Sequence, residues 1–481
     1  MTKPKLNRRR CFSFFSLVFL AFLVGCKPAA SPESLDPGAI QVEALLGSPV
    51  LLANGDSTVY AVIRLTTKAR PTAGRGPVNV ALAMDTSGSM EGPGIVAARR
   101  SALQMIDALA DGDRLSVVVF HSKAEVLLPS VELDPEVRAD VRKRINAMQA
   151  RGTTEMAGGL SVALDQVLSH FDAKGVNRVV LLGDGVPNNA GSIEYTARRA
   201  AGSGIAITTL GLGLDYDEVL MGKVADLSGG RYTFVEDAEK LAGFFKEELF
   251  RIDSVYGRSA TATLTPGPGV RIDGVVGAEP GAPGSAVYLP LGDIAAGDTR
   301  DIVVRMTVTP RKADVPIELL DALVTFDDAL ADAGRLERRA YLGARTTLDP
   351  NVVAKARVPA VDLAAALAET SATTLKALEL SKQGQYGQAR IRLEKGAEAA
   401  LAQVKRTPSV ELEKLAANMT TVAKDMPQVD RPSEVQKAPA AAYEFTDDAV
   451  SGEMVMPQAA EKPSVVRKRK EVHQSAVDYL H

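Results

Sequence analysis

The sequence is poor in the residues on which several kinds of site depend. It contains two cysteines, four histidines and no tryptophan among its 481 residues. Both cysteines, Cys11 and Cys26, lie near the N-terminus, so no disulfide framework is expected in the folded part of the chain. The lack of tryptophan argues against a carbohydrate cleft built on indole rings. A net charge of −3 gives no indication of a nucleic-acid partner.

Motifs that would indicate an enzyme are missing as well. His121 and His170 accompany neither a nucleophile elbow nor a zinc-ligand spacing, and the sequence has no P-loop and no glycine-rich dinucleotide turn. Enzymes that start phosphoryl transfer from a strand-end aspartate usually carry a second aspartate two residues later. Here Asp85 has Ser87 at that position, so the acid–base partner is missing. We therefore expect that the protein is not an enzyme.

Residues 78–90, VNVALAMDTSGSM, combine a strand pattern with a cluster of oxygen donors. The apolar run is typical of a strand buried on both faces at the centre of a parallel sheet. Asp85, Ser87 and Ser89 follow on a tight turn at its carboxyl end, where open α/β sheets bind ligands. One carboxylate with neutral hydroxyls suits a small divalent cation that keeps waters and an open coordination position. The same residue types also gather in turns for backbone reasons alone.

This stretch resembles the metal-ion-dependent adhesion site (MIDAS) of von Willebrand factor type A (VWA) domains, whose signature is Asp-x-Ser-x-Ser. Residues 152–155, Gly-Thr-Thr-Glu, resemble the loop of this family that gives the metal a threonine hydroxyl. The family's spacing back from Leu160 favours Thr154 over Thr153 as that ligand.

A second buried strand over residues 178–183 is similar to the strand of this family that ends in Thr-Asp-Gly. Gly183 replaces the usual threonine, whereas the acidic residue is retained as Asp184. Two later segments match the last strands of bacterial members, so the resemblance runs from about residue 78 to about residue 250.

The resemblance implies a divalent cation, Mg or else Mn or Ca, that is held directly by Ser87, Ser89 and Thr154. Asp85 and Asp184 are implied to bind the cation directly or through water. Two carboxylates and neutral hydroxyls leave the cation under-neutralised with one coordination position open, so an Asp or Glu of a protein ligand can complete the shell. The resemblance therefore implies metal-dependent protein binding.

The predicted fold class is α/β, with a doubly wound, Rossmann-like VWA domain over residues 76–253. Short strands divided by Pro-Gly turns predict a flanking β-sandwich over residues 256–346. A β segment over residues 41–72 precedes the VWA domain, and we expect it to complete this sandwich, with the VWA domain inserted between the two parts. Helices of the VWA domain are predicted at residues 97–110, 137–148, 160–171 and 237–254.

The C-terminal part is expected to be helical and then disordered. Residues 352–426 have apolar residues at helical spacing, which predicts a helical hairpin packed on the β domain. Residues 384–393 also resemble half of a tetratricopeptide-type repeat, although a solenoid needs about three or more units. Residues 427–481 show no period and predict a disordered tail. Its basic run, residues 467–470, is expected to be solvated, the alternative being contact with anionic lipid or polymer.

The N-terminus has the pattern of a secretory signal. Basic residues precede an apolar run over residues 11–25 that is too short to span a bilayer comfortably. Residues 23–26, Leu-Val-Gly-Cys, resemble the bacterial lipobox. This implies removal of a signal peptide, residues 1–25, and acyl chains, palmitate among them, on Cys26. The alternative is an ordinary cleavable signal or a short anchor helix. Residues 26–40 are expected to form a flexible tether.

A lipidated Cys26 implies a protein of the bacterial cell envelope that is held on a membrane without spanning it. Lys27 follows it in place of the aspartate that retains lipoproteins in the inner membrane of many Gram-negative bacteria, so a Gram-negative host implies the outer membrane, facing the periplasm. The favoured hypothesis is a membrane-anchored, extracytoplasmic, adhesion-type module. The alternatives are a structural envelope scaffold whose metal only stabilises loops, and an assembly factor for another complex.

Overall fold

The computed structural model describes residues 36–480 except 69–75, 184–189, 215, 236–250, 252–253, 277–284, 311, 332 and 429–462. The predicted signal peptide with Cys26, the predicted ligand Asp184 and most of the helix predicted at residues 237–254 lie outside the described residues. Of the helices that the structure describes, none has the length and apolar character needed to cross a membrane.

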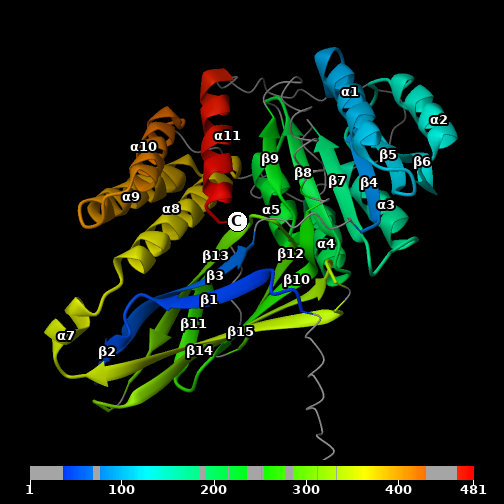
Figure 1. The fold of residues 1–481 in the computed structure, drawn as a ribbon. Helices are drawn as coiled ribbons and strands as arrows, with labels where there is room; N and C mark the ends of the chain where they lie inside the picture. Colours follow the sequence, from blue (N-terminus) through cyan, green and yellow to red (C-terminus); the bar gives the residue numbers. More distant parts are fainter. Residues whose placement is uncertain are drawn as a thin grey trace, which may run out of the picture. The chain divides into compact units, whose positions relative to one another are not determined.

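A six-stranded sheet in the order β6-β5-β4-β7-β8-β9 forms the central domain (Figure 1). All neighbouring strands are parallel except β5 and β6. Every residue of β4, β7 and β8 is buried, as the near-continuous apolar runs predict. Because these three strands are parallel, their carboxyl ends meet at one edge of the sheet. The strands are β4 (Val78–Asp85), β5 (Arg114–Phe120), β6 (Ala124–Glu132), β7 (Val176–Gly183), β8 (Ala206–Leu212) and β9 (Tyr232–Val235).

Helices cover both faces of this sheet. Side chains that alternate along β4 divide between the faces, since Leu82 packs in the core under α1 and α2 while Ala83 packs in the core under α3, α4 and α5. The predicted doubly wound α/β fold class is therefore confirmed. A short 3-10 turn, η1 (Gly88–Met90), leads into α1, and the helices are α1 (Pro93–Ala108), α2 (Pro135–Asn146), α3 (Met156–Leu168), α4 (Ala190–Gly202) and α5 (Glu218–Ser228).

Two antiparallel sheets flank the central domain in sequence. One has the order β1-β3-β13-β11 and the other β12-β10-β14-β15-β2, in which only β15 and β2 are parallel. Strands β3 and β13 pair along ten residues, from Thr66 with Thr299 to Ser57 with Val308. The strands before the central domain thus pair with those after it, as the sequence led us to expect. The strands are β1 (Ile40–Leu46), β2 (Val50–Leu52), β3 (Ser57–Thr67), β10 (Val255–Pro266), β11 (Val270–Val275), β12 (Val287–Ala295), β13 (Thr299–Val308), β14 (Pro316–Asp328) and β15 (Arg335–Thr347).

The segment predicted as a helical hairpin contains three long helices and one short one, so the hairpin prediction was wrong. Gly384, with a φ of 76° that favours glycine, separates α8 from α9. Pro408 and Ser409 then separate α9 from α10, where the Ser409 hydroxyl accepts a hydrogen bond from the N–H of Leu412 at 3.2 Å and caps the new helix. The helices are α7 (Pro350–Lys355), α8 (Pro359–Lys382), α9 (Tyr386–Val404) and α10 (Val410–Asp425).

The predicted disordered tail is also wrong in part, because residues 463–478 form a packed helix, α11 (Pro463–Asp478). This helix, at the red end of the colour scale, contacts β9 and α5 as well as α8 and α10 (Figure 1). Val472, Ala476 and Val477 are buried in these contacts. Lys470, in the basic run predicted to be solvated, is fully buried against Glu218. The countercharge lies 252 residues away in sequence, where inspection of the tail alone does not find it.

Candidate metal centre

The turn after β4 brings together the first three predicted ligands. Asp85 is fully buried at the end of the strand, and its Oδ1 accepts a hydrogen bond from the N–H of Ser87 at 2.8 Å. This bond folds the turn back on the carboxylate. The hydroxyls of Ser87 and Ser89 are hydrogen-bonded to each other, with their oxygens 3.0 Å apart. Two oxygens bound at about 2.1 Å to one octahedral ion are also about 3.0 Å apart, so this spacing fits two ligands of a single Mg²⁺.

Backbone hydrogen bonds fasten a second loop, residues 151–155, to this turn. The N–H of Arg151 donates to the carbonyl of Thr86 at 2.7 Å, and the N–H of Gly88 donates to the carbonyl of Gly152 at 3.0 Å. The loop carries Thr154, which is half-buried. Two of the three predicted loops are therefore held side by side by the backbone itself.

The neighbours of Thr154 have other partners. The carboxylate of Glu155 accepts a hydrogen bond from the N–H of Gly158 at 2.8 Å and so caps α3. Thr153 is exposed, and its hydroxyl lies 3.4 Å from that of Ser122. None of these contacts involves the hydroxyl of Thr154, so the choice of Thr154 over Thr153 stays a prediction.

The third predicted segment approaches from β7, which ends at Gly183 beside Asp85. A Cβ added to Gly183 would lie 3.6 Å from Oδ2 of Asp85 and 3.1 Å from Cε of Met156. The end of the Met156 side chain packs against this position, so a larger residue at position 183 would require Met156 to shift. Asp184 follows directly in the sequence but is outside the described residues.

The donor set fits a hard divalent cation. A buried carboxylate and two hydroxyls converge at the carboxyl edge of the sheet, and the loop that carries a third hydroxyl is hydrogen-bonded beside them. Such oxygen ligands are those that Mg²⁺ prefers while it keeps several waters. Within the described part of the chain, no group of three or more His, Cys, Asp or Glu residues is arranged to hold a metal ion.

A second charged cluster lies at the start of α5, and sequence reasoning did not find it. Glu218 is fully buried, with Lys382 Nζ at 2.9 Å, Arg469 Nε at 2.9 Å and Lys470 Nζ at 3.1 Å from its carboxylate. Burial by itself would raise the pKa of Glu218, but the three cations outweigh it and hold this pKa well below its ordinary value. Burial lowers the pKa of Lys470 to about 8, so both groups of the pair are charged at neutral pH. In the sequence, the signal that could have revealed the packed helix carrying Lys470 was the helical spacing of Val472 and the apolar residues after it.

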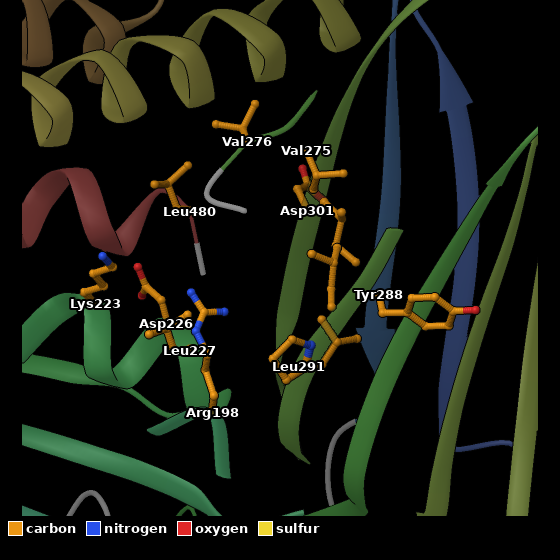
Figure 2. Close-up of a pocket in the computed structure, with 13 residues that line it drawn as sticks. Arg198, Lys223, Asp226, Leu227, Val275, Val276, Tyr288, Leu291, Asp301 and Leu480 are labelled. Atoms are coloured by element: carbon orange, nitrogen blue, oxygen red, sulfur yellow. The ribbon is translucent and has the colours of Figure 1, made fainter. Parts of the chain in front are cut away.

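A cavity of about 300 Å³ lies between the central domain and strands β11, β12 and β13. Figure 2 shows Lys223 and Asp226 on one side and Val275 on the other, with Leu480 above them. Lys223 pairs with Glu194 at 2.8 Å, and Asp301 pairs with Arg64 at 2.6 Å. Because these charges are already neutralised within the chain, the cavity offers fewer binding groups than the edge of the sheet at Asp85.

Comparisons with known proteins identify the central domain. Residues 79–247 match the family model described as von Willebrand factor type A domain. Among solved structures, the chain is similar to a von Willebrand factor type A protein from Catenulispora acidiphila, with a TM-score of 0.64, 21% identity, and coverage of 78% of this chain and 90% of that one. It is also similar to the ArnB paralog VWA2 from Sulfolobus acidocaldarius, with a TM-score of 0.58, 16% identity, and coverage of 92% and 99%. At these identities the likeness concerns the fold.

Curated relatives match over rather more than a third of the chain. Uncharacterized protein YfbK of Escherichia coli is 27% identical over 36% of this chain and 30% of its own length. Uncharacterized protein sll0103 of Synechocystis is 26% identical over 38% and 43%, and human inter-alpha-trypsin inhibitor heavy chain H4 is 28% identical over 36% and 20%. The match thus spans less than half the length of each of these relatives. Taken with the parallel sheet and its flanking helices, these matches show that residues 79–247 are a von Willebrand factor type A domain.

Proposed function

We propose that this protein is a membrane-anchored, extracytoplasmic module that binds a protein ligand through a divalent cation in its VWA domain. The observation that carries the proposal is the convergence of Asp85, Ser87 and Ser89, with the two serine hydroxyls 3.0 Å apart. VWA domains are commonly protein-interaction modules, which supports binding as the role of this edge of the sheet.

In this proposal, Ser87, Ser89 and Thr154 hold Mg²⁺, or else Mn²⁺ or Ca²⁺, by their hydroxyls. Asp85 and Asp184 bind it directly or through water. The bound ion supplies a positive charge, which the carboxylates offset less where they bind it through water, together with one free coordination position. An Asp or Glu side chain of the partner fills that position. The hydroxyl ligands are neutral and do not offset the positive charge of the ion. This charge therefore attracts the partner's carboxylate.

The proposed anchor is the lipid on Cys26. Each buried methylene of an acyl chain contributes about 0.8 kcal/mol, so several chains hold a protein on a membrane where one would not. The residues between Cys26 and β1 then act as a tether that lets the VWA domain reach partners in the envelope. We place the protein on the outer membrane, facing the periplasm, if the host is Gram-negative.

Capture of a partner with and without chelator tests the proposal. Wild-type protein and the variant Asp85→Ala are used to recover envelope proteins in Mg²⁺ and in EDTA. The matched control is Asp140→Ala, which removes an exposed carboxylate whose partner is Arg144 on the same helix. We expect the same partner to be recovered by wild type and control in Mg²⁺, and by neither in EDTA. Asp85→Ala should not recover it under either condition.

The alternative roles predict a different pattern. In a structural scaffold or an assembly factor, the metal only stabilises the loops, and α8–α11 form the working surface. Partner capture that persists in EDTA and in Asp85→Ala supports those roles and contradicts metal-dependent binding.

A further inference from the structure

The C-terminal helix α11 is joined to the VWA domain by a buried lysine. Nζ of Lys470 donates to the carbonyl of Tyr216 at 2.8 Å and to Oε2 of Glu218 at 3.1 Å. It also lies 3.5 Å from the centroid of the Tyr216 ring, in cation–π geometry. Tyr216 belongs to the connection from β8 to α5, and Glu218 is the first residue of α5. Since β8 is parallel to β4 and β7, this connection leaves the same edge of the sheet as the Asp85 turn.

The ring of Tyr216 lies directly on β8. A Cβ added to Gly211 would be 2.0 Å from Cε2 and Cζ of Tyr216, so the ring occupies the space that any side chain at position 211 would take. The hydroxyl of Tyr216 is also hydrogen-bonded to that of Tyr232 at 2.7 Å. Contacts with Lys470 and with the backbone at Gly211, together with this hydrogen bond, thus hold the ring of Tyr216 in place.

The contact continues from Gly211 toward the metal centre. Gly211 is paired with Gly183 in the parallel ladder of β8 and β7. Gly183 in turn faces Asp85, since a Cβ at position 183 would be 3.6 Å from Oδ2 of that residue. Closely packed groups therefore connect Lys470 of α11 to Asp85. The two strands meet here at paired glycines, so no side chain of either strand separates their backbones at this point.

Further along α11, the position of the helix is fixed by His473. Its buried ring packs edge-on against Tyr232, with the centroids 5.0 Å apart, and rests on Gly222 of α5. A Cβ added to Gly222 would lie 2.7 Å from Cε1 of His473, which is closer than real contacts allow. α11 therefore sits closely on α5 only because residue 222 is glycine.

We propose that docking of α11 on the connection from β8 to α5 controls the affinity of the metal centre, and that the bound ion in turn strengthens the docking of α11. The inference rests on the proposed function, since it concerns the same metal site. Docked α11 holds Tyr216, β8 and the end of β7 in the arrangement that places Asp85 for the ion. The coupling is reciprocal, because each binding event favours the same arrangement. Contiguous packing makes such coupling physically possible, and measurement of the coupling is its test.

The first test changes α11 docking from a distance by a matched pair of variants of the full chain. Gly222→Ala forces His473 away from α5, whereas Gly202→Ala, at the end of α4, adds the same methyl group where no atom lies within 4 Å. Mg²⁺ alone is titrated into each protein by calorimetry. We expect Gly222→Ala to bind Mg²⁺ at least about 5-fold more weakly than wild type, the lower end of typical coupling between sites. Gly202→Ala should bind as wild type does.

The second test needs no variant in the docking surface. Hydrogen exchange of the amides of α11 is measured in wild type with Mg²⁺ and with EDTA. Mg²⁺ should slow exchange in α11 by a similar factor of about 5, because linkage is reciprocal. In Asp85→Ala, Mg²⁺ should leave exchange in α11 unchanged.

The outcomes separate the two proposals. Suppose that wild type binds Mg²⁺. The coupling is overturned, and the metal site stands, if Gly222→Ala binds Mg²⁺ equally well although its α11 exchanges faster. The same conclusion follows if Mg²⁺ leaves exchange in α11 of wild type unchanged. If wild type binds no Mg²⁺, the proposed function and the coupling both fail. Weaker binding in Gly222→Ala together with Mg²⁺-dependent protection of α11 supports both.

Discussion

The buried pair of Glu218 and Lys470 allows a quantitative prediction for the docking of α11. Glu218→Gln would neutralise the carboxylate and leave Lys470, which is fully buried, without its countercharge. Lys382 and Arg469 retain partial exposure, 29% and 15% of their side chains, and can turn toward water. The main cost is therefore the unpaired charge of Lys470. Removal of one partner from a buried ion pair typically costs about 3–5 kcal/mol, and we expect a loss of this size in the docking free energy of α11.

The reverse change should cost less. Lys470→Met removes the buried cation but leaves Glu218 with Lys382 and Arg469, so no charge is left unpaired. The loss of the hydrogen bond to the carbonyl of Tyr216 should then dominate, at about 1–3 kcal/mol. For the same reason, the double variant Glu218→Gln/Lys470→Met should be more stable than Glu218→Gln alone, which is a strongly non-additive result.

Native-state hydrogen exchange of α11 is the suitable assay, because a chain of several domains does not unfold in a single two-state transition. The exchange free energy of the α11 amides is compared among wild type, the two single variants and the double variant. Undiminished protection of α11 in Glu218→Gln would refute this account of the pair. So would a double variant whose loss in exchange free energy equals the sum of the losses in the two single variants.

Three further predictions concern pH, the metal ligands and the anchor. Burial lowers the pKa of His473 to about 4, so protonation opposes folding, and α11 protection should fall by up to about 3 kcal/mol as the pH drops from about 6.5 to about 4; pH-independent protection would contradict this. Thr154→Val should weaken Mg²⁺ binding in calorimetry by at least 10-fold, whereas Thr153→Val should not; the reverse result would reassign the ligand. Cys26→Ser should abolish incorporation of labelled palmitate and release the protein from the membrane fraction; retained label would exclude Cys26 as the lipid site.

The strands and the turn of the metal centre were predictable because their determinants are local. An uninterrupted apolar run followed by Asp85, Ser87 and Ser89 specifies both a buried strand and a set of oxygen donors at its end. That the strands before the central domain join those after it was predictable from their alternating pattern, whereas the particular pairing of β3 with β13 was not. The hydrogen bonds that fasten the loop of Thr154 to the Asp85 turn were not, because backbone contacts carry little sequence signal.

The packing of α11 could not be predicted from the tail alone. A run of basic residues next to a low-complexity segment is usually solvated, and the residue that changes this reading, Glu218, lies on another domain. The role of Gly222 is equally invisible in the sequence, since it depends on the ring of His473 in three dimensions. In the helical segment, Pro408 and the N-cap residue Ser409 are local signals for a break and a new helix, so the start of the third long helix was predictable but was missed.

Calorimetric titration of Mg²⁺ into the purified full chain tests the central claim most directly. The account predicts one Mg²⁺ per chain for wild type, with binding lost in Asp85→Ala and kept in Asp140→Ala. Addition of a short peptide with a single Asp or Glu should then produce binding that requires Mg²⁺. Equal Mg²⁺ binding by wild type and Asp85→Ala, or no binding by either, would contradict the claim that the turn after β4 holds the ion.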